Sequence, residues 1–244
     1  MLITMPIPSY VGETKPIGNV GDMKNSGLEF ELGYKWHISD ARFNAKANVT
    51  YLHNELTNLG NDTGYIDLDG FLGISGGGTR GSNGQPFPYF YGYKTAGVFQ
   101  NMAEVNAYTN ADGNLIMPDA KPGDVRFVDV NGDGVINDDD IVPLSYSNTP
   151  TLQYGFAAEF RYKQFTASIF FEGVGKVQYF YGGSGYYPFA WETRGNVLNI
   201  VADQKNRWTP REYSGDASTE NPNARFPRLT YGENKNNNRA STFW

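Results

Sequence analysis

Residues 28–36 read Leu-Glu-Phe-Glu-Leu-Gly-Tyr-Lys-Trp and carry the strongest structural signal in the chain. Large apolar side chains occupy every second position, and charged side chains or glycine fill the positions between them. Because side chains of a β-strand point alternately to its two faces, the pattern predicts a strand with one apolar face. Both glutamates and the lysine fall on the opposite face.

Three further segments, residues 42–51, 152–162 and 164–172, repeat this alternation. Each segment has about 9–11 residues, the length a tilted strand needs to cross a bilayer. Every charge within them falls on the face opposite the apolar one, and Phe170 is the exception to the apolar alternation. The apolar faces hold Phe43, Ala45, Ala47, Val49 and Tyr51, then Leu152, Tyr154, Phe156, Ala158, Phe160 and Tyr162, then Phe165, Ala167, Ile169 and Phe171.

The connections between these strands differ greatly in length. A few residues around 37–40 join the first pair, and Lys163-Gln164 joins the second, whereas residues 54–150 separate the pairs. Short turns on one side and long loops on the other are typical of outer-membrane barrels, as are aromatics beside the turns. We therefore expect an all-β fold that forms part of a large antiparallel transmembrane β-barrel with long extracellular loops. A half-buried strand of a soluble sandwich shows the same alternation, so that alternative stays open.

The long segments are predicted to carry little regular structure. Residues 54–150 are expected to form an extracellular excursion with one extra strand pair, and residues 173–191 begin a second external region. A short helix is expected from residue 197 to about 204, ahead of Trp208-Thr209-Pro210.

Composition excludes several functional classes. The chain has 244 residues, no cysteine, two histidines and a net charge of −6. Neither disulfides nor cysteine-ligated metals are possible, and an acidic chain is a poor nucleic-acid binder. The chain has no run of about 18 apolar residues that would predict a membrane helix, and residues 1–6 lack the pattern of a signal peptide. An aromatic content of 15% argues against disorder.

Residues 129–140, Asp-Val-Asn-Gly-Asp-Gly-Val-Ile-Asn-Asp-Asp-Asp, follow the spacing of a calcium loop. Side-chain oxygens stand at loop positions 1, 3, 5, 9 and 12, glycine at position 6 allows the sharp turn, and position 7 offers a carbonyl. The candidate ligands of Ca²⁺ are Asp129, Asn131, Asp133, Val135, Asn137 and Asp140. The alternative is an Asp/Gly-rich turn that binds no ion.

The flanks of this loop do not predict an EF-hand. Residues 125–128 are β-like, and prolines at positions 143 and 150 follow closely. Asp140 replaces the usual bidentate Glu at position 12, so we expect a weaker site. Dockerins share the loop spacing, but the helix that they require after Asp140 is missing.

Other clusters give weaker signals. The aromatic residues at 87–93 and 179–191 could stack on sugar or peptide ligands, or pack within loops and girdles. The neighbouring Asp138 and Asp139 could suggest a glycosidase, but that chemistry requires two carboxylates facing each other about 5–10 Å apart. We assign no catalytic residue and expect no enzyme.

Several motifs, taken in order, resemble the SusC/RagA family of TonB-linked outer-membrane transporters. Residues 25–29 look like its N-x-G-x-E strand entry, and residues 90–94 with 97–99 look like its fyGYk and Gif segments. Residues 122–127 followed by the calcium-type loop look like its pGD and D-x-NgDG-x-I segments. Residues 208–210 and 226–228 match loop landmarks, and residues 144–150 depart from the family by lacking a glycine.

The resemblance implies that residues 1–244 are the C-terminal portion of a TonB-dependent receptor barrel, with the plug domain and the last strands outside the chain. It also implies import of glycan or peptide nutrients across the Gram-negative outer membrane. The implied partners are a SusD-like lipoprotein, an oligosaccharide or peptide substrate, outer-membrane lipid, and the TonB complex through the missing N-terminal part.

A soluble, β-rich, calcium-binding carbohydrate module is the alternative. The two differ in where the apolar faces lie. In a barrel the apolar side chains of all four strands face outward on one sheet, whereas in a module two such faces pack on each other.

Overall fold

A computed structural model describes residues 2–4, 17–19, 21–61, 63–70, 77–144, 146–180, 187–189, 197–230 and 236–243. The chain divides into two compact units. The first unit comprises Met1–Asp67, Arg80–Tyr89 and Ser145–Tyr179, and the second comprises Leu68–Thr79, Phe90–Leu144 and Phe180–Trp244.

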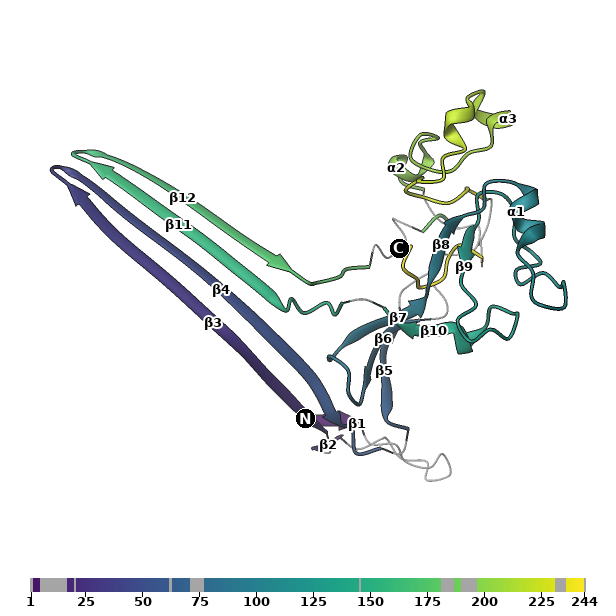
Figure 1. Ribbon diagram of the computed structural model, residues 1–244, viewed down its shortest axis with the longest axis horizontal. Coiled ribbons are helices and arrows are strands. Elements are labelled where there is room, and N and C mark those ends of the chain that lie inside the picture. The colour runs from purple at the N-terminus through teal and green to yellow at the C-terminus, as the bar shows by residue number, and fades with distance from the viewer. Residues whose placement is uncertain are drawn as a thin grey trace. The chain divides into compact units, whose positions relative to one another are not determined.

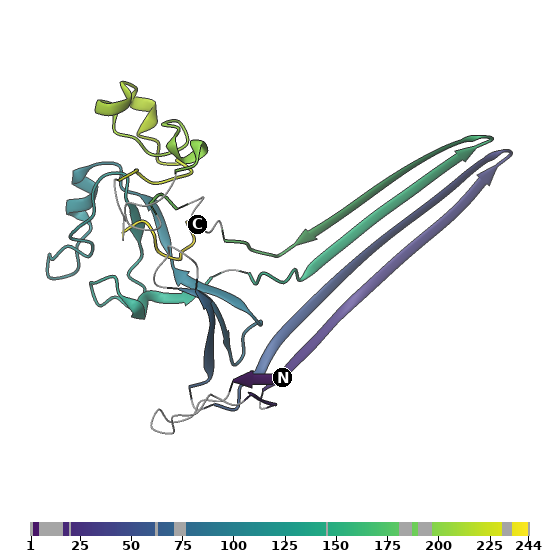
Figure 2. The same ribbon diagram turned by 180° about the vertical axis from the view of Figure 1, so that it is seen from behind.

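Four long strands dominate the first unit. They are β3 (Asp22–Ile38), β4 (Ala41–Asn58), β11 (Leu152–Tyr162) and β12 (Phe165–Gly175). Their order in the sheet is β12-β11-β4-β3, and every neighbouring pair is antiparallel. Figure 1 shows them as adjacent ribbons, purple and blue for the first pair and green for the second, and Figure 2 shows the same sheet from behind. The predicted strands are confirmed.

Both hairpin turns are tight and lie at the same end of the sheet. Ser39 and Asp40 join β3 to β4, and Lys163 and Gln164 join β11 to β12. Ser39 and Lys163 each have φ 52°, the left-handed geometry that a two-residue hairpin loop requires. Ala41 pairs with Ile38 on one side and with Tyr162 on the other, which places the two turns together.

The register brings the apolar positions of all four strands onto one face. In antiparallel strands, directly paired residues point to the same side of the sheet. One such row runs from Leu32 through Ala47 and Phe156 to Phe171, and the rows on either side repeat the pattern. The apolar face is exposed, since Leu28 is 80%, Phe30 is 61% and Phe165 is 62% accessible.

This exposure decides between the two architectures that the sequence left open. In a soluble sandwich these side chains would interdigitate with a second sheet and be buried. Monomeric soluble proteins rarely expose apolar patches larger than a few hundred Å². The exposed apolar face is therefore suited to contact with lipid, as expected of a barrel wall.

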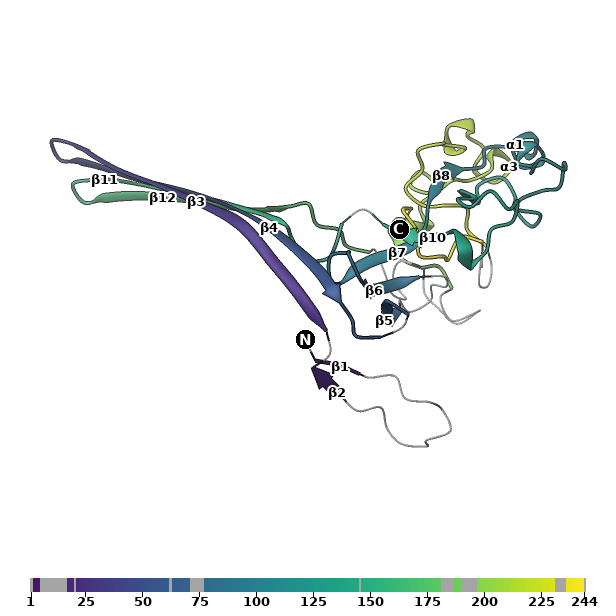
Figure 3. The same ribbon diagram turned by 60° about the horizontal axis from the view of Figure 1, so that its bottom comes forward.

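The first two strands are longer than expected. β3 has 17 residues and β4 has 18, against the 9–11 that alternation indicated. The pairing continues past the alternating part, through Gly27 and Leu52, to an irregularity between Asp22 and Met23. Alternation fades in this extension because it carries polar residues on both faces. Figure 3 shows the pronounced twist along the sheet, which is normal for β structure.

The sheet is open in the described part of the chain. There, β3 pairs only with β4, and β12 only with β11. An edge strand presents unpaired N–H and C=O groups, and a bilayer leaves those groups without water. A larger closed barrel solves this problem by continuing the sheet on both sides.

Shorter strands occupy the long segment between the hairpins. They are β5 (Tyr65–Gly70), β6 (Gly78–Ser82), β7 (Tyr89–Tyr93), β8 (Thr95–Val98), β9 (Val125–Phe127) and β10 (Ile141–Pro143). One sheet has the order β10-β7-β6-β5, and β8 pairs with β9. β1 (Leu2–Thr4) pairs with β2 (Ile17–Asn19). The expectation of one extra strand pair was thus wrong, because short strands with Gly-rich or irregular patterns give little periodic signal.

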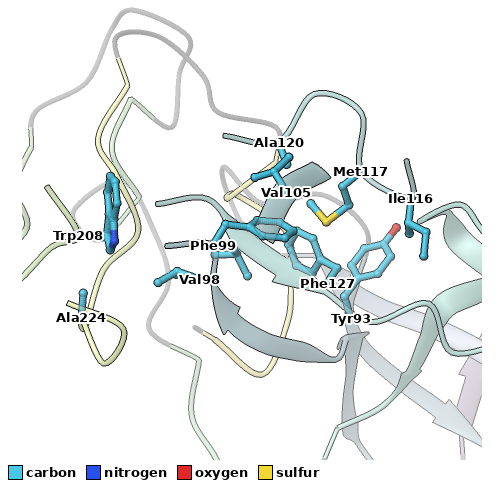
Figure 4. Packing of buried hydrophobic residues seen from close by; sticks show 11 residues of the cluster. Tyr93, Val98, Phe99, Val105, Ile116, Met117, Ala120, Phe127, Trp208 and Ala224 are labelled. Carbon is cyan, nitrogen blue, oxygen red and sulfur yellow. The ribbon is translucent and has the colours of Figure 1, made fainter. Parts of the chain in front are cut away.

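Among the described residues, the hydrophobic cluster with the most members lies in the second unit. Phe99, Val125 and Phe127 are 0% exposed, and Trp208 is 2% exposed. Figure 4 shows the Phe99 and Phe127 rings close to Val105 of α1 (Met102–Ala107) and to Met117, with Trp208 and Ala224 to one side. The full cluster is Tyr93, Val98, Phe99, Val105, Ile116, Met117, Ala120, Val125, Phe127, Trp208 and Ala224.

The remaining helices are short. α2 (Asn199–Ala202) lies within the predicted 197–204 segment, and α3 (Arg211–Ser214) follows. Two 3-10 turns, η2 (Asp138–Asp140) and η3 (Ala217–Thr219), complete the described elements. No helix in the described ranges is long and apolar enough to span a membrane.

Candidate functional site

The four-stranded sheet presents a polar face opposite its apolar one. Its rows of paired residues include Glu31 with Asn48, and Lys35 with Asn44. The continuation onto β11 adds Glu159 opposite Asn44. A sheet with one lipid-compatible face and one hydrated, charged face can separate a bilayer from an aqueous lumen.

Aromatic side chains gather on the apolar face beside the turns, as predicted. Trp36 stacks on Phe43 with ring centroids 5.2 Å apart, and Phe43 packs on Phe160 at 4.8 Å. Tyr162 and Phe165 are paired with each other in the next row of this face toward the turns. Amphipathic aromatic rings favour the interface between lipid and water.

The calcium-type loop is closed by its own carboxylates. Asp129 accepts hydrogen bonds from the backbone N–H groups of Gly132 at 2.7 Å and Gly134 at 2.8 Å. Asp133 accepts from the side-chain amides of Asn131 at 3.0 Å and Asn137 at 3.1 Å. Side chains of loop positions 1, 3, 5 and 9 thus line one compact turn.

Glycine is required at the sharp turn of this loop. Gly134 has φ 86°, a left-handed conformation that favours glycine. A Cβ at this position would lie 2.6 Å from the side-chain amide nitrogen of Asn110.

The carboxylate of Asp140 is fully buried and serves loop closure. It accepts from the backbone N–H of Val130 at 2.7 Å and of Asn137 at 2.9 Å. Asn137 caps η2 in return, and a strand follows at once. The helix of an EF-hand is therefore absent from this part of the chain, as predicted.

The charge on the loop is favoured at neutral pH. The backbone N–H of Val135, and then the side chain of Asn131, lower the pKa of Asp133 below its ordinary value. Within the described residues, no three His, Asp or Glu side chains are grouped as a metal cluster. The oxygen donors at hand are instead a mixture of carboxylates, amides and backbone carbonyls, which suits a hard cation.

A second buried carboxylate, Asp124, holds three sequence motifs together in the second unit. Arg228 donates to it from Nε at 2.5 Å and from Nη2 at 3.1 Å. Asn237 donates its amide to the same carboxylate at 3.0 Å and accepts from the N–H of Val125 at 2.8 Å. The backbone N–H of Lys121 also donates to this carboxylate, at 2.9 Å.

Gly123 lets these segments approach closely. Its φ is 86°, and an added Cβ would lie 2.2 Å from the Trp208 ring and 2.7 Å from Cβ of Arg228. The N–H of Arg228 donates to its carbonyl at 2.8 Å. The motifs at 122–124, 208–210 and 226–228 are therefore parts of one packed node. Sequence reasoning noted each motif but not this contact, because the residues lie about 100 positions apart.

An open cleft of about 790 Å³ lies beside this node in the second unit. Tyr213, which is 76% exposed, stands on its rim. Glu220 pairs with Arg211 through Nη2 at 2.9 Å, and the indole N–H of Trp208 donates to Gln100 at 3.1 Å. The cleft thus combines a free aromatic ring with polar groups, a common composition of ligand sites.

Some residues of the two aromatic clusters that were suggested as ligand-stacking surfaces are buried in the fold. Phe90 is 4% and Tyr93 is 3% exposed, so both serve the fold. In the second cluster Tyr187 is fully buried whereas Tyr179 is 66% exposed. Residues 181–186 and 190–196 lie outside the described residues.

Comparisons with known proteins agree with this arrangement. No family model matches the chain. It is 31% identical to TonB-dependent receptor P26 of Formosa agariphila over 93% of its own length and 21% of that protein. It is 28% identical to TonB-dependent receptor P3 of the same organism over 94% of its length and 22% of that protein. It is 28% identical to TonB-dependent receptor SusC of Bacteroides thetaiotaomicron, over 62% of its own length and 14% of that protein.

Solved structures show the same relationship. The RagAB peptide transporter matches 70% of this chain and 17% of its own, with 25% identity and a TM-score of 0.51. The RagAB peptide importer in the open-open state has the same fold over 72% of this chain and 17% of its own, with 23% identity and a TM-score of 0.54. The chain spans about a fifth of the length of the first curated relatives. These relatives are receptors and transporters, in agreement with the expectation of no enzyme.

Proposed function

This chain matches one segment of the SusC/RagA family of TonB-dependent receptors, and we propose that it forms barrel wall and external loops of an outer-membrane transporter. The observation that carries this proposal is the two-faced sheet, whose apolar face is exposed along all four strands. We assign residues 1–244 to the C-terminal portion of the barrel. In this proposal the short hairpins face the periplasm, and residues 54–150, which connect them, form an extracellular excursion.

Single-cysteine labelling tests this topology. The chain has no cysteine, so one introduced thiol in it reports one position. Ser39→Cys marks the β3–β4 turn and Asp112→Cys marks an exposed loop of the second unit. In intact cells that express the receptor containing this chain, a membrane-impermeant maleimide is expected to label Asp112→Cys alone. Ser39→Cys should react only after the outer membrane is permeabilised. Labelling of both in intact cells contradicts the proposal.

The substrate in this proposal is an oligosaccharide or a peptide, delivered with a SusD-like lipoprotein and powered by the TonB complex through other parts of the receptor. The RagAB structures concern a peptide transporter, and one curated relative is SusC. The test is uptake of labelled oligosaccharides and peptides, with co-purification of a lipoprotein. Tyr213→Ala in the cleft should reduce uptake, whereas Tyr146→Ala, an exposed tyrosine in the first unit, should not.

We propose a second function, cation binding, for the loop at residues 129–140. The observation that favours it is the compact turn in which Asp129, Asp133 and Asn137 present oxygens while glycine at 134 holds the sharp bend. Ca²⁺ is the best match to hard oxygen donors at this spacing.

Calorimetric titration of Ca²⁺ into the purified receptor tests the loop. Asp129→Ala combined with Asp133→Ala should abolish the binding isotherm. Asp112→Ala, an exposed acid outside the loop, should preserve it. Equal isotherms from the wild type and the double variant would refute the site.

A further inference from the structure

The apolar face of the four-stranded sheet is hollowed near its hairpin end. The hollow has a volume of about 380 Å³. Its lining includes three alanines, Ala45 on β4, Ala158 on β11 and Ala167 on β12. Ala45 and Ala158 are direct cross-strand partners, so two small side chains stand together in the middle of the sheet. We call this feature the alanine hollow. It lies toward the hairpin turns, which are the far tips of the strands in Figure 1.

Large side chains stand around the alanine hollow. Tyr34 and Ile169 flank the paired alanines in the same row of the register, on β3 and β12. Phe43 and Phe160 occupy the next row toward the turns, with ring centroids 4.8 Å apart. Trp36 stacks on Phe43 from the other side, at 5.2 Å. Because these rings already hold one another in place, a ligand in the hollow orders few side chains when it binds.

The alanine hollow lies at the depth of lipid acyl chains. Ala158 is four residues from Tyr162, the last residue of β11. Four residues at about 3.3 Å each span about 13 Å along the strand, which is about 10 Å of depth at a strand tilt of about 40°. One leaflet is about 15 Å deep, half of a hydrocarbon core of about 30 Å. The hollow is therefore surrounded by acyl chains of the leaflet nearer to the hairpin turns.

A cation stands at the hairpin end of the same face. Lys163 lies in the β11–β12 turn, and its Nζ is 5.3 Å from the ring centroid of Tyr162. The Tyr162 ring belongs to the apolar face, so this contact holds the ammonium group on the side of the hollow. Within the part of the chain that the structure describes, Lys163 forms no salt bridge, not even with Asp40 of the neighbouring turn. An uncompensated lysine at the membrane surface attracts anionic lipid headgroups.

We propose that the alanine hollow and Lys163 bind one anionic phospholipid of the periplasmic leaflet. An acyl chain lies in the hollow, and the headgroup phosphate lies at the Lys163 ammonium group. The inference rests on the proposed function, because the hollow meets that leaflet only if the sheet belongs to a barrel with its hairpins on the periplasmic side. Charge complementarity sets the anionic headgroup. The apolar hollow sets the acyl chain, since a free phosphate has no apolar part to fill it.

Photocrosslinking from the lipid tests this proposal. The intact receptor is reconstituted in phosphatidylcholine nanodiscs that contain a small fraction of phosphatidylglycerol with a diazirine midway along one acyl chain. After irradiation, mass spectrometry maps the adducts. The row of Phe30 and Val49 is an internal control, because it lies two residues inside the opposite end of the apolar face, as the row of Trp36 and Phe43 does at the hairpin end. Adducts should be at least fivefold more abundant on the segments that line the hollow, residues 43–45, 158–160 and 167–169, than on the control row.

Variants then test the two parts of the site separately. Ala158→Phe fills the hollow and should lower the adduct yield there at least tenfold, and Ala158→Leu should act in the same direction. Val49→Phe adds bulk on the same face outside the hollow and should leave the yield unchanged. Lys163→Glu should lower the yield at least fivefold, whereas Lys163→Arg should retain most of it because the positive charge remains. Heat-dependent migration in gels confirms that each variant still forms a barrel.

Three outcomes overturn the proposal: equal labelling of the hollow and the control row, a yield that both substitutions of Ala158 leave unchanged, or a yield that Lys163→Glu leaves unchanged. These outcomes are separable from failure of the proposed function. If maleimide labelling supports the topology and the adducts are spread evenly over the apolar face, only the lipid site fails. If maleimide labelling contradicts the topology, the assignment to the periplasmic leaflet fails together with the proposed function.

Discussion

Replacing Arg228 by methionine removes the cation from the node around Asp124 while keeping a side chain of similar length. The wild-type carboxylate is 0% exposed and receives two hydrogen bonds from the guanidinium, at 2.5 and 3.1 Å. In the variant it keeps the Asn237 amide at 3.0 Å and the Lys121 N–H at 2.9 Å. A buried charge then remains without its counter-ion.

The expected cost follows from the burial of the carboxylate. Removing one partner of a buried ion pair destabilises a protein by about 3–5 kcal/mol. The hydrogen bonds that Asn237 and Lys121 still donate place Arg228→Met near the lower end, at about 3 kcal/mol. Replacing both partners, Asp124→Asn with Arg228→Met, removes the stranded charge, so the double variant should lose only about 1 kcal/mol. The two substitutions should therefore be strongly non-additive.

Hydrogen exchange of the intact receptor measures this effect locally. The N–H of Val125 donates to Asn237 inside the node, so its exchange reports local opening. A loss of about 3 kcal/mol corresponds to roughly a hundredfold faster exchange, since about 1.4 kcal/mol is a factor of ten. The double variant should exchange more slowly than Arg228→Met. An increase below threefold for the single variant, or faster exchange in the double variant, would refute the reasoning.

Two further predictions follow from the faces of the sheet and from the cleft. Ala47→Arg on the apolar face should destabilise the receptor in lipid vesicles by about 2–4 kcal/mol, whereas Asn48→Arg on the polar face should cost little, measured by urea unfolding. If Ala47→Arg and Asn48→Arg lowered the free energy of unfolding equally, the assignment of one face to lipid and the other to water would be contradicted. The backbone N–H of Arg211 lowers the pKa of Glu220 below the ordinary 4.5, so this contact stabilises α3 fully above pH 4.5 and is lost as the pH falls through the lowered pKa. Exchange protection of the Arg211 amide, corrected for intrinsic rates, should fall in that range, and Glu220→Gln should remove the pH dependence.

The sequence alone predicted the strands that carry the clearest physical signal. Alternation over residues 28–36 and its three repeats is a local property, because neighbouring side chains of a strand point to opposite faces. The short turns around residues 37–40 and 163–164, and the absence of an EF-hand helix after Asp140, were also predicted from local sequence. The family resemblance added the transporter assignment, which alternation by itself does not give.

The tertiary structure decided what depends on contacts between distant residues. Exposure of Leu28 and Phe30 ruled out the sandwich, because only the packed fold shows whether an apolar face is covered. The pairing of Arg42 with Arg161, and of Asp124 with Arg228, joins residues more than 100 positions apart. Local patterns carry no information on such pairs, because strand order and loop packing, rather than backbone periodicity, bring them together.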